Sequence, residues 1–253
     1  MRIEGNSYYI DNKSPFIQES KFKTTTVSKV FDFAYEMSFG KDGEHRKYRS
    51  GGQYNRRNGQ IFINTFQGKL AELGVFNEFF KYNNVVYNSN DLSKPDFEVY
   101  GLGAWDDADI VYKKIKFSVK STKFYGNLLL LETKDWNENA EYIPNIKSEN
   151  ASYDYLILVR IKEDGEALMK SRSFLYKDKL QKQELYSLIF SKEWFYDIPG
   201  YITNDDLKSI INNNQIMPQN ALLNGRIRMD AENYYEETGA LQDFKKLILD
   251  LPV

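Results

Sequence analysis

Residues 109–120, with the sequence DIVYKKIKFSVK, have the alternating apolar and polar pattern of a β-hairpin. If Lys113 and Lys114 form a two-residue turn, Asp109 lies directly opposite Ser118. Successive side chains of a strand point to opposite faces of the sheet, so the hairpin has an apolar face and a polar face. The apolar face carries Ile110, Tyr112, Ile115, Phe117 and Val119, and the polar face carries Asp109, Lys116, Ser118 and Lys120. This register predicts that Asp109 and Lys120 are diagonal neighbours, within reach of one ligand.

An acid and a lysine on one face of a sheet suit the hydrolysis of a phosphodiester bond. A carboxylate can hold a divalent cation, which polarises the phosphate and lowers the pKa of a bound water. A lysine can orient or deprotonate that water and offset the charge of the transition state. An ordinary cross-strand ion pair, which contributes roughly 0–1 kcal/mol, has the same spacing and is the alternative interpretation.

Residues 65–82, TFQGKLAELGVFNEFFKY, predict a helix before the hairpin. Its apolar stripe is expected to contain Leu73, Val75, Phe76, Phe79 and Phe80. Glu72 falls within this stripe, because apolar residues follow three, four and seven positions later, whereas Glu78 is expected to point elsewhere. A carboxylate on a buried face needs a partner, a metal ion or a proton. Glu72 is therefore the predicted second acid, unless the stripe lies elsewhere and Glu72 is exposed.

The rest of the chain mixes the two kinds of secondary structure and has no internal repeat. Strands are expected at 84–87, 96–100, 127–132 (a strand or the start of a helix) and 153–161. Helices are expected within 14–38, over about 204–213 with Thr203 as the N-cap, and within 228–249. This mixture predicts an α/β fold in a single domain over 1–253, with a core at about 65–165 and a C-terminal helical part at about 166–253.

Composition limits the possible chemistry. The 253 residues include no cysteine and one histidine, His45, which excludes disulfides, thiolate zinc sites and sites with several histidines. A metal ion would have to be a hard cation held by oxygen ligands, such as magnesium, manganese or calcium. No apolar run approaches the roughly 20 residues of a membrane span, and we expect a soluble, cytoplasmic protein with no membrane partner. A net charge of −2 does not by itself indicate a nucleic-acid partner.

A local basic segment is nevertheless present at 41–60, which is polar, contains glycines and predicts a long loop. Cations in such a loop can neutralise phosphates, and arginine can also bind guanine in the major groove. A solvated surface is the alternative. The candidate DNA-binding residues in this loop are Arg46, Lys47, Arg49, Arg56 and Arg57, and a weaker second group is Asn224, Arg226 and Arg228.

A helix with a carboxylate, then KPDFEVYGLGAWDDADIVY at 94–112, then IKFSVKST at 115–122, resembles the core of the PD-(D/E)xK nucleases. The order of elements is similar to that of type II restriction endonucleases, and the resemblance covers roughly residues 65–135. It implies a restriction-endonuclease-like core, in which helices flank a mixed β-sheet. The implied activity is sequence-specific cleavage of double-stranded DNA in restriction-modification, with Mg²⁺ as cofactor and Mn²⁺ as its substitute. Symmetric cutting of both strands implies a homodimer.

The resemblance also implies roles for individual residues. Asp109 would be the metal-binding aspartate and Lys120 the motif lysine, with the Val119 carbonyl as a further metal ligand. Ser118 stands where the motif has an acid, and some restriction enzymes with a serine there recruit a glutamate from elsewhere. The candidates for that glutamate are Glu72 first and Glu132 second, and the alternatives to Asp109 are Asp96, in a literal Pro-Asp, and Asp107, opposite Lys120.

Three other functions remain open from the sequence. The first is a nuclease of the same fold that acts in repair or on DNA junctions. The second is a DNA-binding protein that has lost catalysis, which Ser118 at the acidic position of the motif would allow. The third is a structural protein without a nucleic-acid partner, which the mildly acidic composition would allow.

Overall fold

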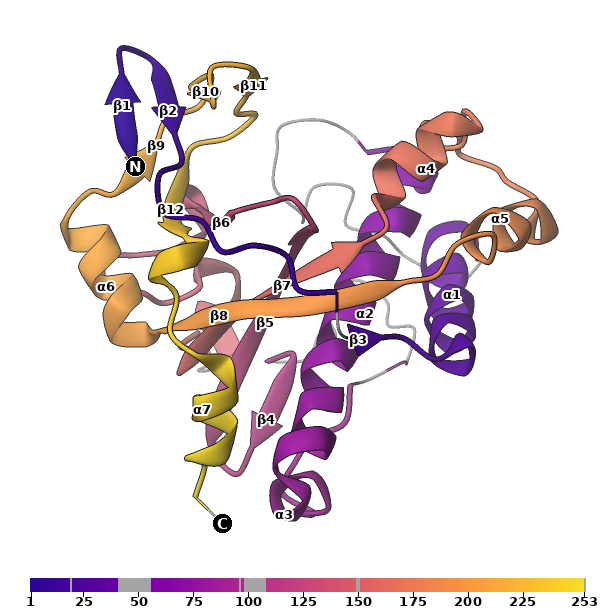
Figure 1. The fold of residues 1–253 in the computed structure, drawn as a ribbon, viewed down its shortest axis with the longest axis horizontal. Coiled ribbons are helices and arrows are strands. Elements are labelled where there is room, and N and C mark those ends of the chain that lie inside the picture. The colour runs from indigo at the N-terminus through magenta and orange to yellow at the C-terminus, as the bar shows by residue number, and fades with distance from the viewer. Residues whose placement is uncertain (19, 41–55, 96, 98–107, 149–150, 253) are drawn as a thin grey trace.

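The main sheet of the protein has five strands and is mixed. The computed structural model describes residues 1–18, 20–40, 56–95, 97, 108–148 and 151–252. The strand order is β3 (Ser20–Lys21), β8 (Phe195–Thr203), β7 (Tyr155–Lys162), β5 (Ile115–Lys123) and β4 (Ile110–Tyr112) (Figure 1). Strands β5 and β7 are parallel, and the other neighbours are antiparallel. The expected class is confirmed in its coarse form, because the chain is a mixed α/β protein.

The β4–β5 hairpin has the register that the sequence predicts. Ile110 pairs with Phe117, Val111 with Lys116, and Tyr112 with Ile115. Lys113, in the turn, has a φ of +55°, which two-residue hairpin turns require. The hairpin forms one edge of the main sheet, and β5 continues past the end of β4 as far as Lys123.

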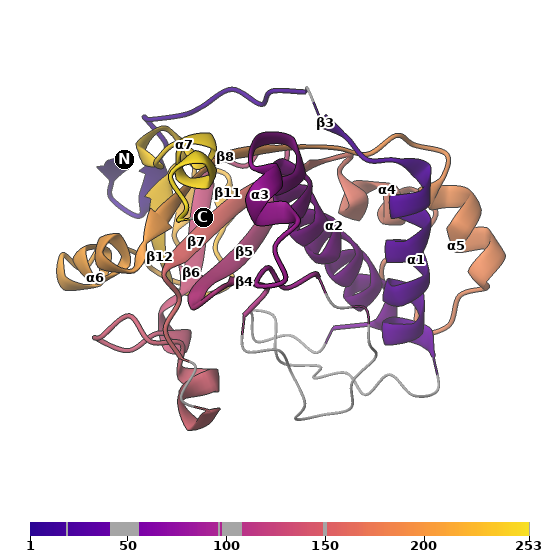
Figure 2. The ribbon, with the colours of Figure 1, turned by 90° about the horizontal axis from the view of Figure 1, so that it is seen from below.

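The sheet separates two hydrophobic cores. Phe117 and Ile157 face one core, which is shared with α1 (Thr24–Phe39), α2 (Asn58–Tyr82) and α5 (Lys182–Ile189). Leu156 and Leu158, on the other face, pack with α6 (Asn204–Asn212) and with β6 (Leu128–Glu132). Figure 2 shows α1, α2 and α5 together on one side of the sheet and α6 on the other.

Two smaller sheets complete the second side. Strand β6 pairs with β12 (Asn233–Glu237), which also pairs with β9 (Ile216–Met217). A four-stranded sheet has the order β1 (Arg2–Glu4), β2 (Ser7–Tyr9), β10 (Leu222–Leu223) and β11 (Ile227–Arg228). The remaining described elements are α3 (Asn84–Tyr87), α4 (Gly165–Ser171), α7 (Phe244–Leu249) and the 3-10 turns η1 (Thr133–Asp135), η2 (Ile143–Ser148) and η3 (Thr238–Ala240). None of the helices described here is long and apolar enough to span a membrane.

Several predicted elements are present. Strand β7 occupies most of the segment 153–161, and 127–132 forms a strand and not a helix. Helix α6 begins after Thr203, whose side chain accepts a hydrogen bond from the backbone N–H of Asp206. Asp206 binds the Thr203 backbone in return, so the two residues form a capping box.

Other predicted elements differ from the structure. Residues 84–87 form a helical turn and not a strand, because the Asn83 side chain caps it by accepting from the Val86 N–H. Within 228–249 only α7 is a helix, since β12 is held between β6 and β9. The part after 166 is likewise not only helical, because it supplies β8 to the main sheet. Most of the expected strand at 96–100 lies outside the described residues.

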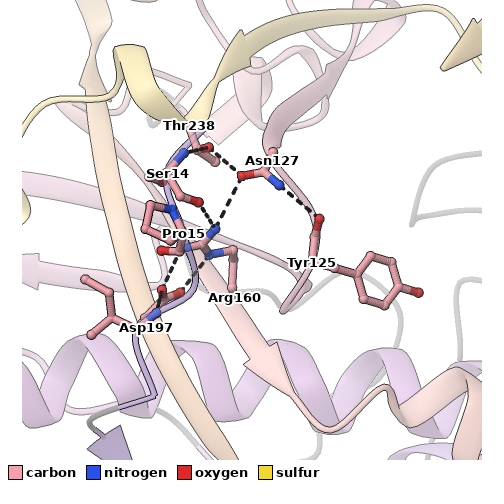
Figure 3. A network of polar contacts seen from close by, with 8 residues as sticks. Ser14, Pro15, Tyr125, Asn127, Arg160, Asp197 and Thr238 are labelled. Carbon is pink, nitrogen blue, oxygen red and sulfur yellow. Dashed lines mark hydrogen bonds and ion pairs between the residues drawn. The ribbon is translucent and has the colours of Figure 1, made fainter. Parts of the chain in front are cut away.

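Arg160 of β7 is the most buried charge that the structure describes, with 1% of its surface exposed. Its guanidinium donates to Asp197 in two hydrogen bonds, Nε to Oδ1 at 2.8 Å and Nη2 to Oδ2 at 2.5 Å. It also donates to the backbone carbonyls of Ser14 and Pro15, at 2.8 Å each (Figure 3). Such a pair fixes the N-terminal segment across β7 and β8, and removal of one partner leaves a buried charge without compensation.

We predict that Asp197→Ala lowers the free energy of unfolding by about 3–5 kcal/mol, because it leaves Arg160 buried and without its counter-ion. Urea denaturation at neutral pH measures this loss. The control is Glu193→Ala, which removes an exposed ion pair with Lys21 and should cost at most about 1 kcal/mol. Equal losses in the two variants would show that the buried pair contributes nothing specific.

Candidate functional site

The Asp109 carboxylate is fixed to the neighbouring strand β5. Its Oδ2 atom accepts the backbone N–H of Val119 at 2.6 Å and the hydroxyl of Ser118 at 3.4 Å. Ser118 is buried, with 2% of its surface exposed. The predicted juxtaposition of Asp109 and Ser118 is therefore present, and Ser118 acts there as a small hydrogen-bond donor beside the acid.

Lys120 lies on the same face of the sheet as Ser118, because the two residues are two positions apart on β5. Their partners in β7 are Leu156 and Leu158, which belong to the second core. The Lys120 ammonium lies 5.8 Å from the ring centroid of Tyr142. Its side chain lines a cleft of about 750 Å³, together with Val119 and Tyr142.

Four carboxylates line the cleft with Lys120, those of Glu132, Asp135, Glu166 and Asp230. Glu132 ends strand β6, and Asp135 ends the 3-10 turn that follows it. Glu132 has 12% of its side chain exposed, and Lys134 lies 2.7 Å from its Oε2 atom. Burial raises the pKa of the Asp135 carboxyl, and the charge of Glu132 raises it further, while Lys134 and Lys120 lower it. Lys120, Glu132 and Asp135 therefore form one electrostatic unit, with the lysine favouring the charged form of Asp135.

A second cation, Arg56, lines the same cleft just before α2 begins. Burial lowers the pKa of its guanidinium, whereas the charges of Asp230 and Glu132 raise it. Glu132 thus interacts with cations from two parts of the chain, Lys134 in the next turn and Arg56 from the start of α2. The arrangement brings positive and negative groups to one partly enclosed surface, where electrostatic interactions are stronger than in bulk water.

The structure corrects the prediction for the two glutamates of α2. Glu78 is buried, with 8% exposed, and accepts a hydrogen bond of 2.9 Å from the Tyr196 hydroxyl. Burial and the Glu78 charge raise the pKa of Tyr196. Phe80, expected in the stripe, is 57% exposed. The buried stripe instead continues through Leu70 and Gly74 to Glu78, because Tyr196 of β8 lies against Gly74 and Glu78.

Glu72 keeps 15% of its side chain exposed and forms an ion pair of 2.5 Å with Lys69, one turn earlier on α2. Helix α2 packs on the face of the sheet that carries Phe117, as the 5.8 Å contact between the Phe79 and Phe117 rings indicates. Lys120 belongs to the opposite face. Of the two candidate glutamates, Glu132 lines the Lys120 cleft and Glu72 does not, although Asn64 and Gln67 of α2 do.

The candidate DNA-binding residues are divided in space. Arg56 and Asn224 line the Lys120 cleft from opposite ends of the sequence. Arg226 and Arg228 are exposed in the hairpin next to Asn224. Arg57 instead donates to Asp178 at 2.5 Å, at the start of α2. Arg46, Lys47 and Arg49, with the alternative acids Asp96 and Asp107, lie outside the described residues.

Asp135 and Tyr142 are among the cleft residues that the sequence did not predict. The signal for Asp135 was its position three residues after Glu132, on a turn that follows a strand. Within the described ranges no group of three or more His, Cys, Asp or Glu side chains is placed to hold a metal ion. A metal ion at this cleft would therefore need ligands from outside such a group, such as water and substrate oxygens.

Comparison of the chain with protein families, with curated proteins and with solved structures finds no match.

We predict that the charges of Glu132 and Lys120 shift the Asp135 pKa in opposite directions. Glu132→Gln removes a negative charge and should lower that pKa, whereas Lys120→Met removes a positive charge and should raise it. Carboxyl carbon NMR during a pH titration measures both changes. Glu184→Gln, at an exposed position of α5, is the control and should leave the Asp135 pKa unchanged. If the Asp135 pKa were the same in the wild type and in all three variants, Asp135 would not interact with Glu132 and Lys120 as described.

Proposed function

We propose that this protein is a divalent-metal-dependent DNA endonuclease and that the Lys120 cleft is its active site. The observation that carries the proposal is the β4–β5 hairpin. In this hairpin the Asp109 carboxylate accepts a hydrogen bond from the backbone N–H of Val119. The next residue, Lys120, lines a cleft together with Glu132 and Asp135. The resemblance of residues 65–135 to the PD-(D/E)xK nucleases supports the same chemistry.

The residues fit magnesium by the chemistry of their donors. Mg²⁺ prefers oxygen ligands, keeps several waters, and is usually held by one or two carboxylates and by substrate phosphates. Asp109 and Glu132 would provide the carboxylates, and the Val119 carbonyl would be a further oxygen ligand. A bound divalent cation supplies polarisation of the phosphate and a lower pKa for its water.

Lys120 has two roles in this proposal. Its ammonium would orient the attacking water and offset the negative charge that develops on the phosphate oxygens. Asp135 would hold the ammonium over the cleft, since the two charges attract each other. Ser118 would have no part in nucleophilic attack, because its hydroxyl donates to Asp109 inside the sheet.

Glu132 is preferred over Glu72 as the glutamate that replaces the acid missing at Ser118. Glu132 lines the cleft of Lys120, and the core beneath it includes Ala108, the neighbour of Asp109. Glu72 is ion-paired with Lys69 and is not among the residues that line the cleft. By the family resemblance we further propose that the substrate is double-stranded DNA, that cleavage is site-specific as in type II restriction enzymes, and that the enzyme is a homodimer.

Mutation of the proposed active site should reduce cleavage without loss of the fold. We expect Lys120→Ala, Asp109→Asn and Glu132→Gln each to lower the rate of Mg²⁺-dependent plasmid cleavage by about 100-fold or more. Removal of the metal by EDTA should abolish cleavage by the wild type. Conversion of supercoiled plasmid to nicked and linear forms measures the rate.

The matched controls are Lys114→Ala, an exposed lysine in the turn of the same hairpin, and Glu72→Gln on α2. Both should cut within a few-fold of the wild type. Normal cleavage by Lys120→Ala would remove the cleft from the mechanism. A large loss in Glu72→Gln with normal cleavage by Glu132→Gln would exchange the roles of the two glutamates.

A further inference from the structure

The β10–β11 hairpin carries two exposed arginines beside the Lys120 cleft. Its turn contains Asn224, Gly225 and Arg226, because Leu223 pairs with Ile227. Arg226 and Arg228 are exposed, and Ile227 between them is 57% exposed. Neither arginine has an ion-pair or hydrogen-bond partner for its side chain within the described ranges. Leu223, Asn224 and Ile227 line the same cleft as Lys120.

The hairpin is held firmly to the rest of the protein. Asn224 and Gly225 both have positive φ, +50° and +68°, as a tight turn requires. The backbone N–H of Asn224 donates to the Tyr8 carbonyl at 2.7 Å, and the Asn224 side-chain oxygen accepts from Ile10 at 3.2 Å. Strand β10 also pairs in parallel with β2, so the hairpin is part of a larger sheet. The two arginines are therefore presented on a preorganised element, which lowers the entropic cost of binding.

The same cleft is lined by Asn64 and Gln67 of α2 and by Arg56, which precedes that helix. Lys120 and Lys123 of β5 line it as well. These cations share the lining with four carboxylates, those of Glu132, Asp135, Glu166 and Asp230. The exposed arginines of the β10–β11 hairpin add positive charge beside this cleft of mixed charge, which favours contact with a polyanionic chain.

We propose that the β10–β11 hairpin enters the major groove of duplex DNA, with Arg226 and Arg228 on backbone phosphates and Ile227 toward the bases. This inference rests on the proposed function and names how the substrate is held over the Lys120 cleft. The major groove, about 12 Å wide, admits a two-stranded β-ribbon and has a phosphate backbone on each side. Side chains alternate along β11, so residues 227 and 228 face different sides of the ribbon.

The test is the salt dependence of binding, which needs no knowledge of a recognition sequence because phosphate contacts are independent of sequence. Fluorescence anisotropy with a labelled 30-base-pair duplex, in EDTA to prevent cleavage, measures affinity from low to moderate salt. We expect Arg226→Ala/Arg228→Ala to weaken binding by about tenfold or more. The slope of log K against log salt should become shallower by roughly two, because about 0.9 is lost for each phosphate contact.

The control is Arg172→Ala/Lys179→Ala, which removes two exposed cations at and after the end of α4. It should change the slope little. Arg226→Gln/Arg228→Gln removes both charges but keeps polar side chains, and it should match the alanine variant. Thermal unfolding of each variant verifies that it is folded. The labelled single strand should bind more weakly than the duplex.

The outcomes separate this inference from the proposed function. If the wild type binds and cuts DNA but both hairpin variants behave like the control, the hairpin proposal is wrong and the nuclease proposal stands. The same follows if single-stranded DNA binds the wild type as tightly as the duplex. If the hairpin variants lose binding as expected but the wild type never cuts with metal, the hairpin proposal stands and the nuclease proposal is wrong. No duplex binding at low salt would overturn both.

Discussion

Pairing of β5 on both edges is the constraint on which the site depends. Strand β4 fixes β5 from one edge in an antiparallel register, and β7 fixes it from the other in a parallel register. Alternation along the strand then assigns Phe117 to the core beneath α2 and Ser118 to the opposite face. A slip of one residue would exchange these faces and bury Lys120 against aromatic side chains. The register therefore determines that Lys120 lies on the same face of the sheet as Ser118 and not on the face of Phe117.

The cleft combines segments that are distant in the sequence. Its residues come from the start of α2, from β5, from the turn after β6 and from the β10–β11 hairpin. The buried pair of Arg160 and Asp197 is connected to this cleft. Arg160 Nη1 donates to the side-chain oxygen of Asn127 at 3.4 Å, and Asn127 lines the cleft (Figure 3). Fold stability and site geometry thus share one polar network.

The local features of this architecture could be predicted from the sequence. The hairpin register follows from a period of two residues and a short turn, and the α6 N-cap follows from Thr203 and Asp206. Features that depend on distant partners could not. The burial of Glu78 depends on Tyr196 and Ser20, and β12 is a strand because β6 and β9 pair with it. Asp135 was missed because only the turn after β6 brings it beside Lys120.

The family resemblance and the structure contribute different parts of the account. The resemblance directs attention to Asp109 and Lys120, and the geometry favours Glu132 over Glu72 as their partner acid. Burial and the charge of Glu132 raise the pKa of the Asp135 carboxyl, while Lys134 and Lys120 lower it. Residues whose pKa is shifted by burial and by neighbouring charges are concentrated at functional sites.

The most direct test of the central claim is incubation of the purified protein with several unrelated phage DNAs, with Mg²⁺ and with EDTA, followed by gel electrophoresis. The account predicts discrete bands that differ between the DNAs, require the metal ion and carry 5′-phosphate ends. Intact DNA across a range of Mg²⁺ and Mn²⁺ concentrations would contradict the account, and a mobility shift without cleavage would identify a DNA-binding protein instead.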